Sequence, residues 1–118
     1  MKKLTVVLAS LLFVSSYSVF AEKSHTAIAY DHASMAVAAG SAGNAREAVK
    51  HAEAAIDHVL PASLSAKGAS KNHLNEASDA LRQAIDQGNL GHANTATVHA
   101  QAAVDLIKAG SVKEDHIK

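Results

Sequence analysis

The chain has 118 residues, with 11 Lys and Arg against 11 Asp and Glu, so its formal net charge is zero when histidine is neutral. It has no cysteine, which excludes disulfides, thiolate metal sites and attachment of a c-type haem. No strongly basic segment stands out, so we expect no nucleic-acid partner.

The first 21 residues have the pattern of a secretory signal peptide. Lys2 and Lys3 form a basic start, residues 4–14 form an apolar run, and residues 19–21 (VFA) resemble a cleavage site. The apolar run is too short for a transmembrane anchor. We predict cleavage after this segment and export to the periplasm, which leaves a mature chain of residues 22–118 with no membrane partner.

Cap residues predict the first two helices. Ser24 is a favourable N-cap for a helix that runs to about Gly40, where the sequence GSAGN forms a turn. Asn44, followed three residues later by Glu47, has the spacing of a capping box and begins the second helix. Proline is unfavourable in a helix interior, so we expect the second helix to end at Pro61.

The second half of the chain is expected to form another pair of helices. Residues 61–70 (PASLSAKGAS) have the composition of a linker, and Ser70 can cap a third helix that ends near Gly88. The sequence GNLG forms a turn there, and a fourth helix runs to about residue 109, with Gly110 as its stop.

The two halves resemble each other at a constant offset of 48 residues. Residues 25–58 and 73–106 share 13 identical positions of 34 without a gap, and seven of these are alanine pairs. The other six are His25/His73, Asp31/Asp79, Gly40/Gly88, Gly43/Gly91, His51/His99 and Asp57/Asp105. We therefore predict an all-α fold, an antiparallel four-helix bundle built from two duplicated helical hairpins. The expected domain covers residues 22–110, with hairpins over about 24–60 and 70–109 and a flexible tail over 111–118.

Apolar residues at helical spacing predict the core. The predicted stripe of the second helix is Ala45, Val49, Ala52, Ile56 and Val59, and that of the fourth is Ala93, Thr97, Ala100, Val104 and Ile107. His51 and His99 lie off these stripes, so we expect them to be at least partly exposed.

Histidines recur seven residues apart, as His25/His32, His51/His58 and His92/His99. Seven residues return a side chain to nearly the same face of a helix, about 10.5 Å along its axis. Two nitrogens that bind one ion lie within about 4 Å of each other, because metal–nitrogen bonds are about 2.0–2.1 Å. Two histidines of one heptad are therefore expected to serve different ions.

The partner of each histidine is expected on the facing helix. In an antiparallel hairpin that turns near residues 41–43, His32 lies level with His51, and His25 lies level with His58. We call these two pairs rungs. In the second hairpin the equivalent pairs are Ala80/His99 and His73/Leu106, so each keeps one histidine.

Nearby side chains extend the candidate site. Glu47 precedes His51 by four residues, within reach on one helix face. Imidazole and carboxylate ligands without thiols suit Cu(II), Ni(II) or Zn(II), and Cu(II) has the highest general affinity. Met35, three residues after His32, has a spacing more typical of a core residue, and His116 in the tail is expected to be a solvated surface residue.

The sequence resembles the small metal-binding protein family, whose members are exported, cysteine-free, histidine-rich four-helix bundles. The resemblance rests on VKHAEAAIDH, VHAQAAVDL, GNLGH and SHTA (residues 49–58, 98–106, 88–92 and 24–27). It implies a protein that binds several divalent metal ions, notably copper, in periplasmic scavenging or buffering. Delivery of the metal is a further expected role, and we expect the protein to be a monomer. The metal ligands that it implies are His25, His32, His51, His58, His73, His92 and His99. The chain has fewer histidines than the family pattern, with Ala80 and Leu106 at two expected positions.

Two other kinds of protein remain open. A di-iron enzyme would need carboxylates on several helices and two Glu-x-x-His motifs, but residues 22–25 (EKSH) are the only match, and no nucleophile–base arrangement is apparent. We therefore expect no enzyme activity. A helical scaffold or adaptor of the cell envelope, with no metal role, is the alternative; its histidines would form a pH-sensitive surface.

Overall fold

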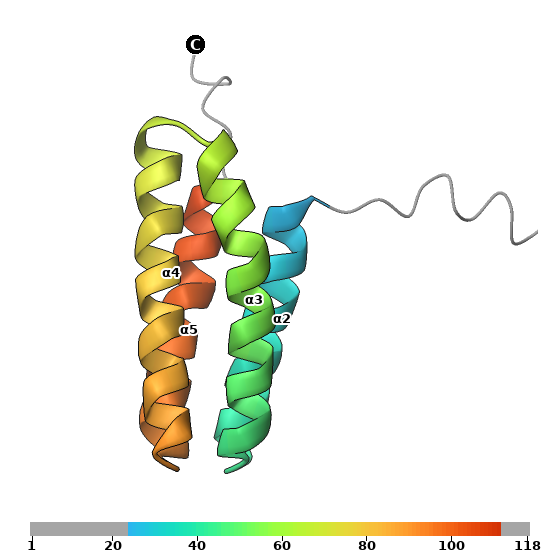
Figure 1. The fold of residues 1–118 in the computed structure, drawn as a ribbon, viewed down its shortest axis with the longest axis vertical. Helices are drawn as coiled ribbons and strands as arrows, with labels where there is room; N and C mark the ends of the chain where they lie inside the picture. The colour runs from blue at the N-terminus through green and yellow to red at the C-terminus, as the bar shows by residue number, and fades with distance from the viewer. Residues whose placement is uncertain (1–23, 112–118) are drawn as a thin grey trace, which may run out of the picture.

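Four α-helices form the part of the protein that the computed structural model describes, residues 24–111 (Figure 1). They are α2 (His25–Ser41), α3 (Ala45–Ser65), α4 (Gly68–Asn89) and α5 (Ala93–Gly110). Both α2 and α4 pack against α3 and α5, which confirms the predicted all-α four-helix bundle. None of the helices in this range is long and apolar enough to cross a membrane. The predicted signal peptide and His116 lie outside the described residues.

Both hairpin turns lie at one end of the bundle, and the α3–α4 link lies at the other (Figure 1). The two turns have the same backbone structure. Gly43 and Gly91 adopt φ values of 84° and 83°, a region that favours glycine. The residue after Gly43 donates its N–H to the Ala39 carbonyl, and the residue after Gly91 donates to the Gln87 carbonyl, each at 2.9 Å. These bonds close the helix ends in Schellman motifs, so both hairpins turn in the same way.

The predicted N-caps of the first hairpin are present. Ser24 Oγ accepts a hydrogen bond from the Ala27 N–H, and Asn44 Oδ1 accepts one from the Glu47 N–H, both at 3.1 Å. The capping box is only half formed, however. The Asn44 N–H already bonds inside the turn, which leaves the Glu47 carboxylate directed toward His51 instead.

Pro61 does not end α3, contrary to the prediction. The helix continues for four more residues to Ser65, with Pro61 inside it. Proline removes one backbone donor, and its cost is offset here because Ala62 and Ser63 are buried against the rest of the bundle. Lys71 Nζ also donates to the Ser63 carbonyl at 2.9 Å, which satisfies an acceptor near the helix end.

The link between the hairpins is accordingly shorter than predicted, two residues in place of about ten. Only residues 66–67 separate α3 from α4, which begins at Gly68. Ser70 is therefore not an N-cap. It lies inside the first turn of α4, and its hydroxyl donates to the Gly110 carbonyl at the end of α5.

The core consists mainly of alanine. Its largest fully buried side chains are Val59, Leu74, Leu81 and Ile107, and its alanines lie at positions 29, 33, 36, 52, 55, 62, 77, 80, 84, 100 and 103. Small side chains allow the helices to approach closely, so a thin core still excludes water. Close packing is therefore the main source of stability that this composition offers.

The predicted core stripes are partly wrong. Their other members are buried, but Ala45, Ile56, Ala93 and Thr97 are only half-buried. Because α3 and α5 each pack against two neighbours, the buried face of each helix is wider than one stripe and includes further alanines, at positions 48, 55, 96 and 103. Met35 is 46% exposed, so it is not the core residue that its spacing suggested.

Two glycines allow close contacts between the hairpins. A methyl group built on Gly40 of α2 would collide with Thr97 of α5, and one on Gly88 of α4 would collide with Val49 of α3. The backbone carbonyls of Ala93 and Ala45 would lie 3.3 Å from those methyl groups. Each hairpin therefore inserts a glycine against the other, at positions 48 residues apart in the chain.

Replacing Gly88 by alanine is expected to destabilise the bundle. Alanine is favoured over glycine in a helix by about 1 kcal/mol, but overpacking typically costs about 1–3 kcal/mol. Val49 is buried and β-branched, so it has little freedom to move away. Urea unfolding followed by circular dichroism should show a lower stability for Gly88→Ala. The double variant Val49→Ala/Gly88→Ala should be less unstable than the sum of the single changes, and a Gly88→Ala protein more stable than wild type would contradict the packing described.

Candidate functional site

Four histidines of the first hairpin lie in one continuous file between α2 and α3. The order along the file is His25, His58, His32, His51, and each ring is next to the following one. His25 is exposed and the other three are half-buried. We call these four residues the histidine row. Both predicted rungs are present in it, since His25 contacts His58 and His32 contacts His51.

The first rung is the closest pair of ring nitrogens. His25 Nδ1 and His58 Nδ1 are 2.9 Å apart, and the ring centroids are 5.2 Å apart. At this distance one Nδ1–H donates a hydrogen bond to the lone pair of the other Nδ1. The two rings must therefore be in opposite tautomers when both are neutral.

The second rung is a looser, stacked pair. The centroids of His32 and His51 are 5.7 Å apart, with 25° between the ring planes. His32 Nδ1 is buried and has no hydrogen-bond partner within the described part of the chain. An unpartnered imidazole nitrogen is free to accept a proton or bind an ion once the ring turns toward it.

A contact that the sequence analysis missed joins the two rungs. His32 and His58 are stacked with centroids 6.4 Å apart and only 11° between the planes. Side chains lean toward the N-terminus of their own helix, so in an antiparallel pair His32 leans up toward the first rung and His58 leans down toward the second. The direction of this lean follows from the predicted hairpin, so the contact could have been predicted. The sequence analysis missed it because it matched residues only by their height along the hairpin.

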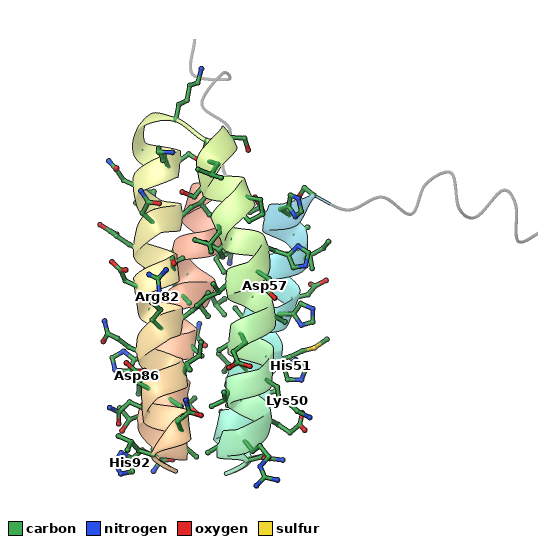
Figure 2. The ribbon with its side chains drawn as sticks, in the orientation of Figure 1. Lys50, His51, Asp57, Arg82, Asp86 and His92 are labelled. Atoms are coloured by element: carbon green, nitrogen blue, oxygen red, sulfur yellow. The ribbon has the colours of Figure 1, made fainter. Side chains whose placement is uncertain are left out.

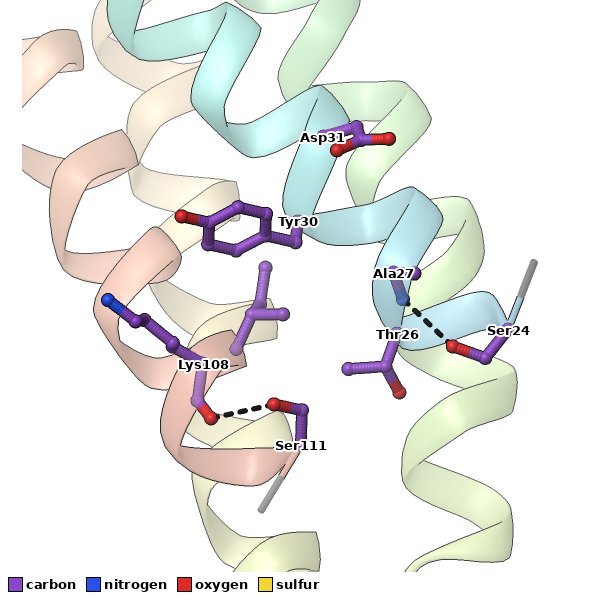
Figure 3. Close-up of a pocket in the computed structure, with 8 residues that line it drawn as sticks. Ser24, Thr26, Ala27, Tyr30, Asp31, Lys108 and Ser111 are labelled. Atoms are coloured by element: carbon purple, nitrogen blue, oxygen red, sulfur yellow. Dashed lines mark hydrogen bonds between the residues drawn. The ribbon is translucent and has the colours of Figure 1, made fainter.

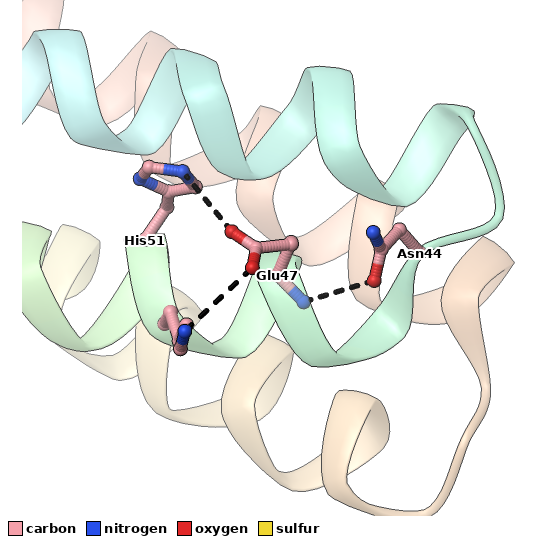
Figure 4. A network of polar contacts seen from close by, with 4 residues as sticks. Asn44, Glu47 and His51 are labelled. Atoms are coloured by element: carbon pink, nitrogen blue, oxygen red, sulfur yellow. Dashed lines mark hydrogen bonds and ion pairs between the residues drawn. The ribbon is translucent and has the colours of Figure 1, made fainter.

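Glu47 ends the row at the hairpin turn (Figure 4). Its Oε1 lies 3.8 Å from His51 Nε2, and its Oε2 lies 3.7 Å from Lys50 Nζ. The Asn44 cap holds the Glu47 backbone at the start of α3, so the carboxylate is positioned one turn before His51. The His51 side chain is 29% exposed and reachable from solvent, and Figure 2 shows it on the side of α3 near α2.

The remaining predicted ligands are not brought together. His73 and His99 are half-buried on α4 and α5, and neither they nor His92 has a ring contact with another histidine within residues 24–111. His92 is exposed at the N-cap of α5, at the turn end of the bundle in Figure 2, and its Nδ1 is 2.9 Å from Gln87 Oε1. Ala80 is buried and Leu106 is half-buried at the positions that correspond to His32 and His58.

The described residues contain no ready-made group of three or more His, Cys, Asp or Glu side chains placed to hold one metal ion. The row offers pairs instead. Each pair presents two imidazoles, and for the second rung a carboxylate is nearby. The hairpin already holds the backbones of the two histidines in place, so each pair is a candidate chelating pair.

A separate cleft lies between the start of α2 and the end of α5 (Figure 3). Its volume is about 340 Å³, and Tyr30, Asp31, Ile107 and Lys108 are among the residues that line it. Ser24 and Ser111 at its edges form hydrogen bonds within their own helix ends. No histidine lines this cleft, so it is distinct from the histidine row.

The contact between His25 and His58 predicts opposite tautomers for the two rings in the metal-free protein. Long-range proton–nitrogen correlation spectra, recorded at a pH where both rings are neutral, should show a protonated Nδ1 in one and a protonated Nε2 in the other. His99 provides an internal comparison, since it has no such partner among the described residues. Unprotonated Nδ1 atoms in both rings would show that they do not share a proton.

Comparison with known proteins bears on the identity of the chain. The model of one protein family, described as small metal-binding protein, matches residues 1–110, which include the whole histidine row. A search of curated proteins finds no match. Since the family match covers far more than half of the sequence, the chain belongs to the small metal-binding protein family.

Proposed function

We propose that this protein binds divalent transition-metal ions through the histidine row, in a periplasmic role of buffering, scavenging or delivery. Membership of the small metal-binding protein family supports metal binding in general. The observation that carries the proposal is the first rung, in which two imidazole nitrogens from different helices lie 2.9 Å apart.

The spacing of the first rung favours Cu(II) or Ni(II). Two nitrogens bound at right angles to one ion lie about 2.9 Å apart, whereas tetrahedral binding separates them by about 3.3 Å, for bonds of about 2.0–2.1 Å. Right angles between ligands are typical of tetragonal Cu(II) and Ni(II) sites. Replacing the shared proton of His25 and His58 by such an ion keeps the nitrogens at this separation but turns each ring by about 45°, because the ion lies off the line that joins the two nitrogens. Zn(II), which prefers tetrahedral sites, is expected to bind less well.

The second rung has a mixed set of ligands. His32 and His51 supply imidazoles, and the Glu47 carboxylate can approach the same ion by a change of side-chain rotamer. Oxygen and nitrogen ligands together suit the borderline divalent ions. Water completes the coordination in either rung, and His73, His92 and His99 act as weaker single ligands.

We further propose that the protein is a monomer without catalytic activity. The predicted signal peptide, residues 1–21, supports the periplasmic location. The shared turn structure and the reciprocal glycine contacts support an origin by duplication of one hairpin. In that case the second hairpin descends from a copy that has lost two of its histidines.

Titration of the metal-free mature protein with Cu(II) in a calorimeter tests the function. We expect saturable binding at about pH 7.5 and much weaker binding at about pH 5, because protons compete for the imidazole lone pairs. Ion at a hundredfold excess over the dissociation constant should also stabilise the fold by about 2.7 kcal/mol per site. Binding no tighter than about millimolar would favour the scaffold alternative.

Elemental analysis of the protein purified from its native source without an affinity tag identifies the metal that it carries.

The two hairpins are expected to differ in affinity. His51→Ala removes one imidazole of the second rung, so it should weaken Cu(II) binding at that rung by about tenfold or more, equivalent to about 1.4 kcal/mol, while the first rung still binds. His32→Ala added to His51→Ala should cost the second rung little more. His99→Ala is the matched control, because His99 occupies the corresponding position of the second hairpin, where Ala80 replaces its partner. Loss of the tightest site in His99→Ala, with His51→Ala unaffected, would contradict this assignment.

A further inference from the structure

The spacing along the histidine row is compatible with one ion at every step. Two imidazoles that bind one ion have centroids at most about 6.5 Å apart, since each bond is about 2.0–2.1 Å and the ring adds roughly 1.2 Å. The three successive centroid separations are 5.2, 6.4 and 5.7 Å. The diagonal pair, His32 and His58, therefore lies within the same limit as the two rungs.

The ring orientations can adapt to an ion at the diagonal. His32 and His58 now face each other with 11° between their planes, so their nitrogens must turn inward to share a ligand. Rotation about the last side-chain torsion of histidine has broad minima and costs little. His32 Nδ1 has no hydrogen bond to lose, because it is unpartnered in the described structure.

The antiparallel arrangement makes this diagonal, and no other, short. His32 and His58 lean toward each other because each side chain points toward the start of its own helix. By the same rule His25 leans toward the open end of the hairpin, and His51 leans toward Glu47, 3.8 Å away. The inner pair thus converges and the outer pair, His25 and His51, diverges.

We propose that His32 and His58 form a third chelating pair, so that the row consists of three overlapping pairs and not two separate rungs. This inference rests on the proposed function. The diagonal pair uses one histidine from each rung, so it cannot bind an ion while both rungs are filled. The row therefore holds at most two ions. A single ion has three alternative positions, and it can pass from one to the next by exchanging one imidazole while the shared imidazole stays bound.

The second hairpin lacks the inner pair. Ala80 and Leu106 occupy the positions of His32 and His58, and His73 and His99 occupy those of the outer pair. His73 and His99 have no ring contact with each other. The second hairpin is thus a natural example of a hairpin from which both inner histidines have been removed.

Two matched double variants test the proposal. His25→Ala/His51→Ala removes the outer pair, and His32→Ala/His58→Ala removes the inner pair; each leaves one histidine in each rung. If only the rungs bind metal, the two variants lose tight binding equally. If the diagonal is a chelating pair, His25→Ala/His51→Ala retains one tight Cu(II) and His32→Ala/His58→Ala retains none on this hairpin. The histidines outside the row are the same in both, so they cancel in the comparison.

Calorimetry with Cu(II) gives the number of tight ions, and electron paramagnetic resonance gives the number of bound nitrogens. Circular dichroism first confirms that both variants keep the wild-type helix content, as expected for alanine in helices. We expect affinity at least about tenfold higher for the outer-pair variant, and two nitrogens on its ion. Equal affinities in the two variants, with wild type still binding tightly, would overturn this inference and leave the proposed function intact. Absence of tight binding by the wild type would overturn both.

Discussion

The register of the first hairpin is the constraint on which the candidate site depends. Gly43, in a left-handed backbone conformation, is the central residue of the three-residue turn between α2 and α3. That turn decides which residue of α2 lies opposite which residue of α3. Adding one residue to it would rotate α3 by about 100° and separate the two halves of each histidine pair. The proposed metal ligands are thus positioned by backbone hydrogen bonds at one end of the bundle, which lies about four helical turns from His25.

Much of the fold follows from local signals in the sequence. Ser24, Asn44, Gly43 and Gly91 act as the cap and turn residues that their types predict, and the two rungs follow from the turn position by counting. The errors arise where tertiary contacts outweigh local preference. Pro61 is kept inside α3 because the residues after it are buried. Neither the length of that helix nor the two-residue link can be read from residues 61–70 alone.

In the candidate site, too, some features follow from the sequence and others depend on tertiary contacts. Pairing across the hairpin depends on residue numbers, so His25/His58 and His32/His51 could be predicted. The contact between His32 and His58 depends on side-chain direction, and the half-formed capping box depends on competition for the Glu47 carboxylate between the Asn44 N–H and His51. The exposure of Met35 depends on how α2 is rotated against two neighbours at once. The contact between His32 and His58 could have been predicted from the lean of helical side chains, whereas the other two features need the assembled bundle.

The two hairpins combine close structural correspondence with different chemistry. Their turns have the same hydrogen bonds, and their glycines make reciprocal contacts with the opposite hairpin. The differences lie at the positions of His32 and His58, where the second hairpin has a buried alanine and a half-buried leucine. Leu106 packs against the core, so its side chain adds apolar contact where the first hairpin has an imidazole. The second hairpin therefore has an apolar contact at a position where the first hairpin has a candidate metal ligand.

The short connections described above have a consequence for how fast the bundle assembles. Three helix pairs are neighbours in sequence, joined by three, two and three residues. Within residues 24–111, distant parts of the chain meet mainly where α2 packs against α5, with a smaller contact between α3 and α5. Helical proteins dominated by such local contacts fold in microseconds to milliseconds. Under the proposed function, a metal ion would therefore meet a folded histidine row, and we expect its capture to be limited by diffusion and by the loss of water from the ion, not by the folding of the polypeptide.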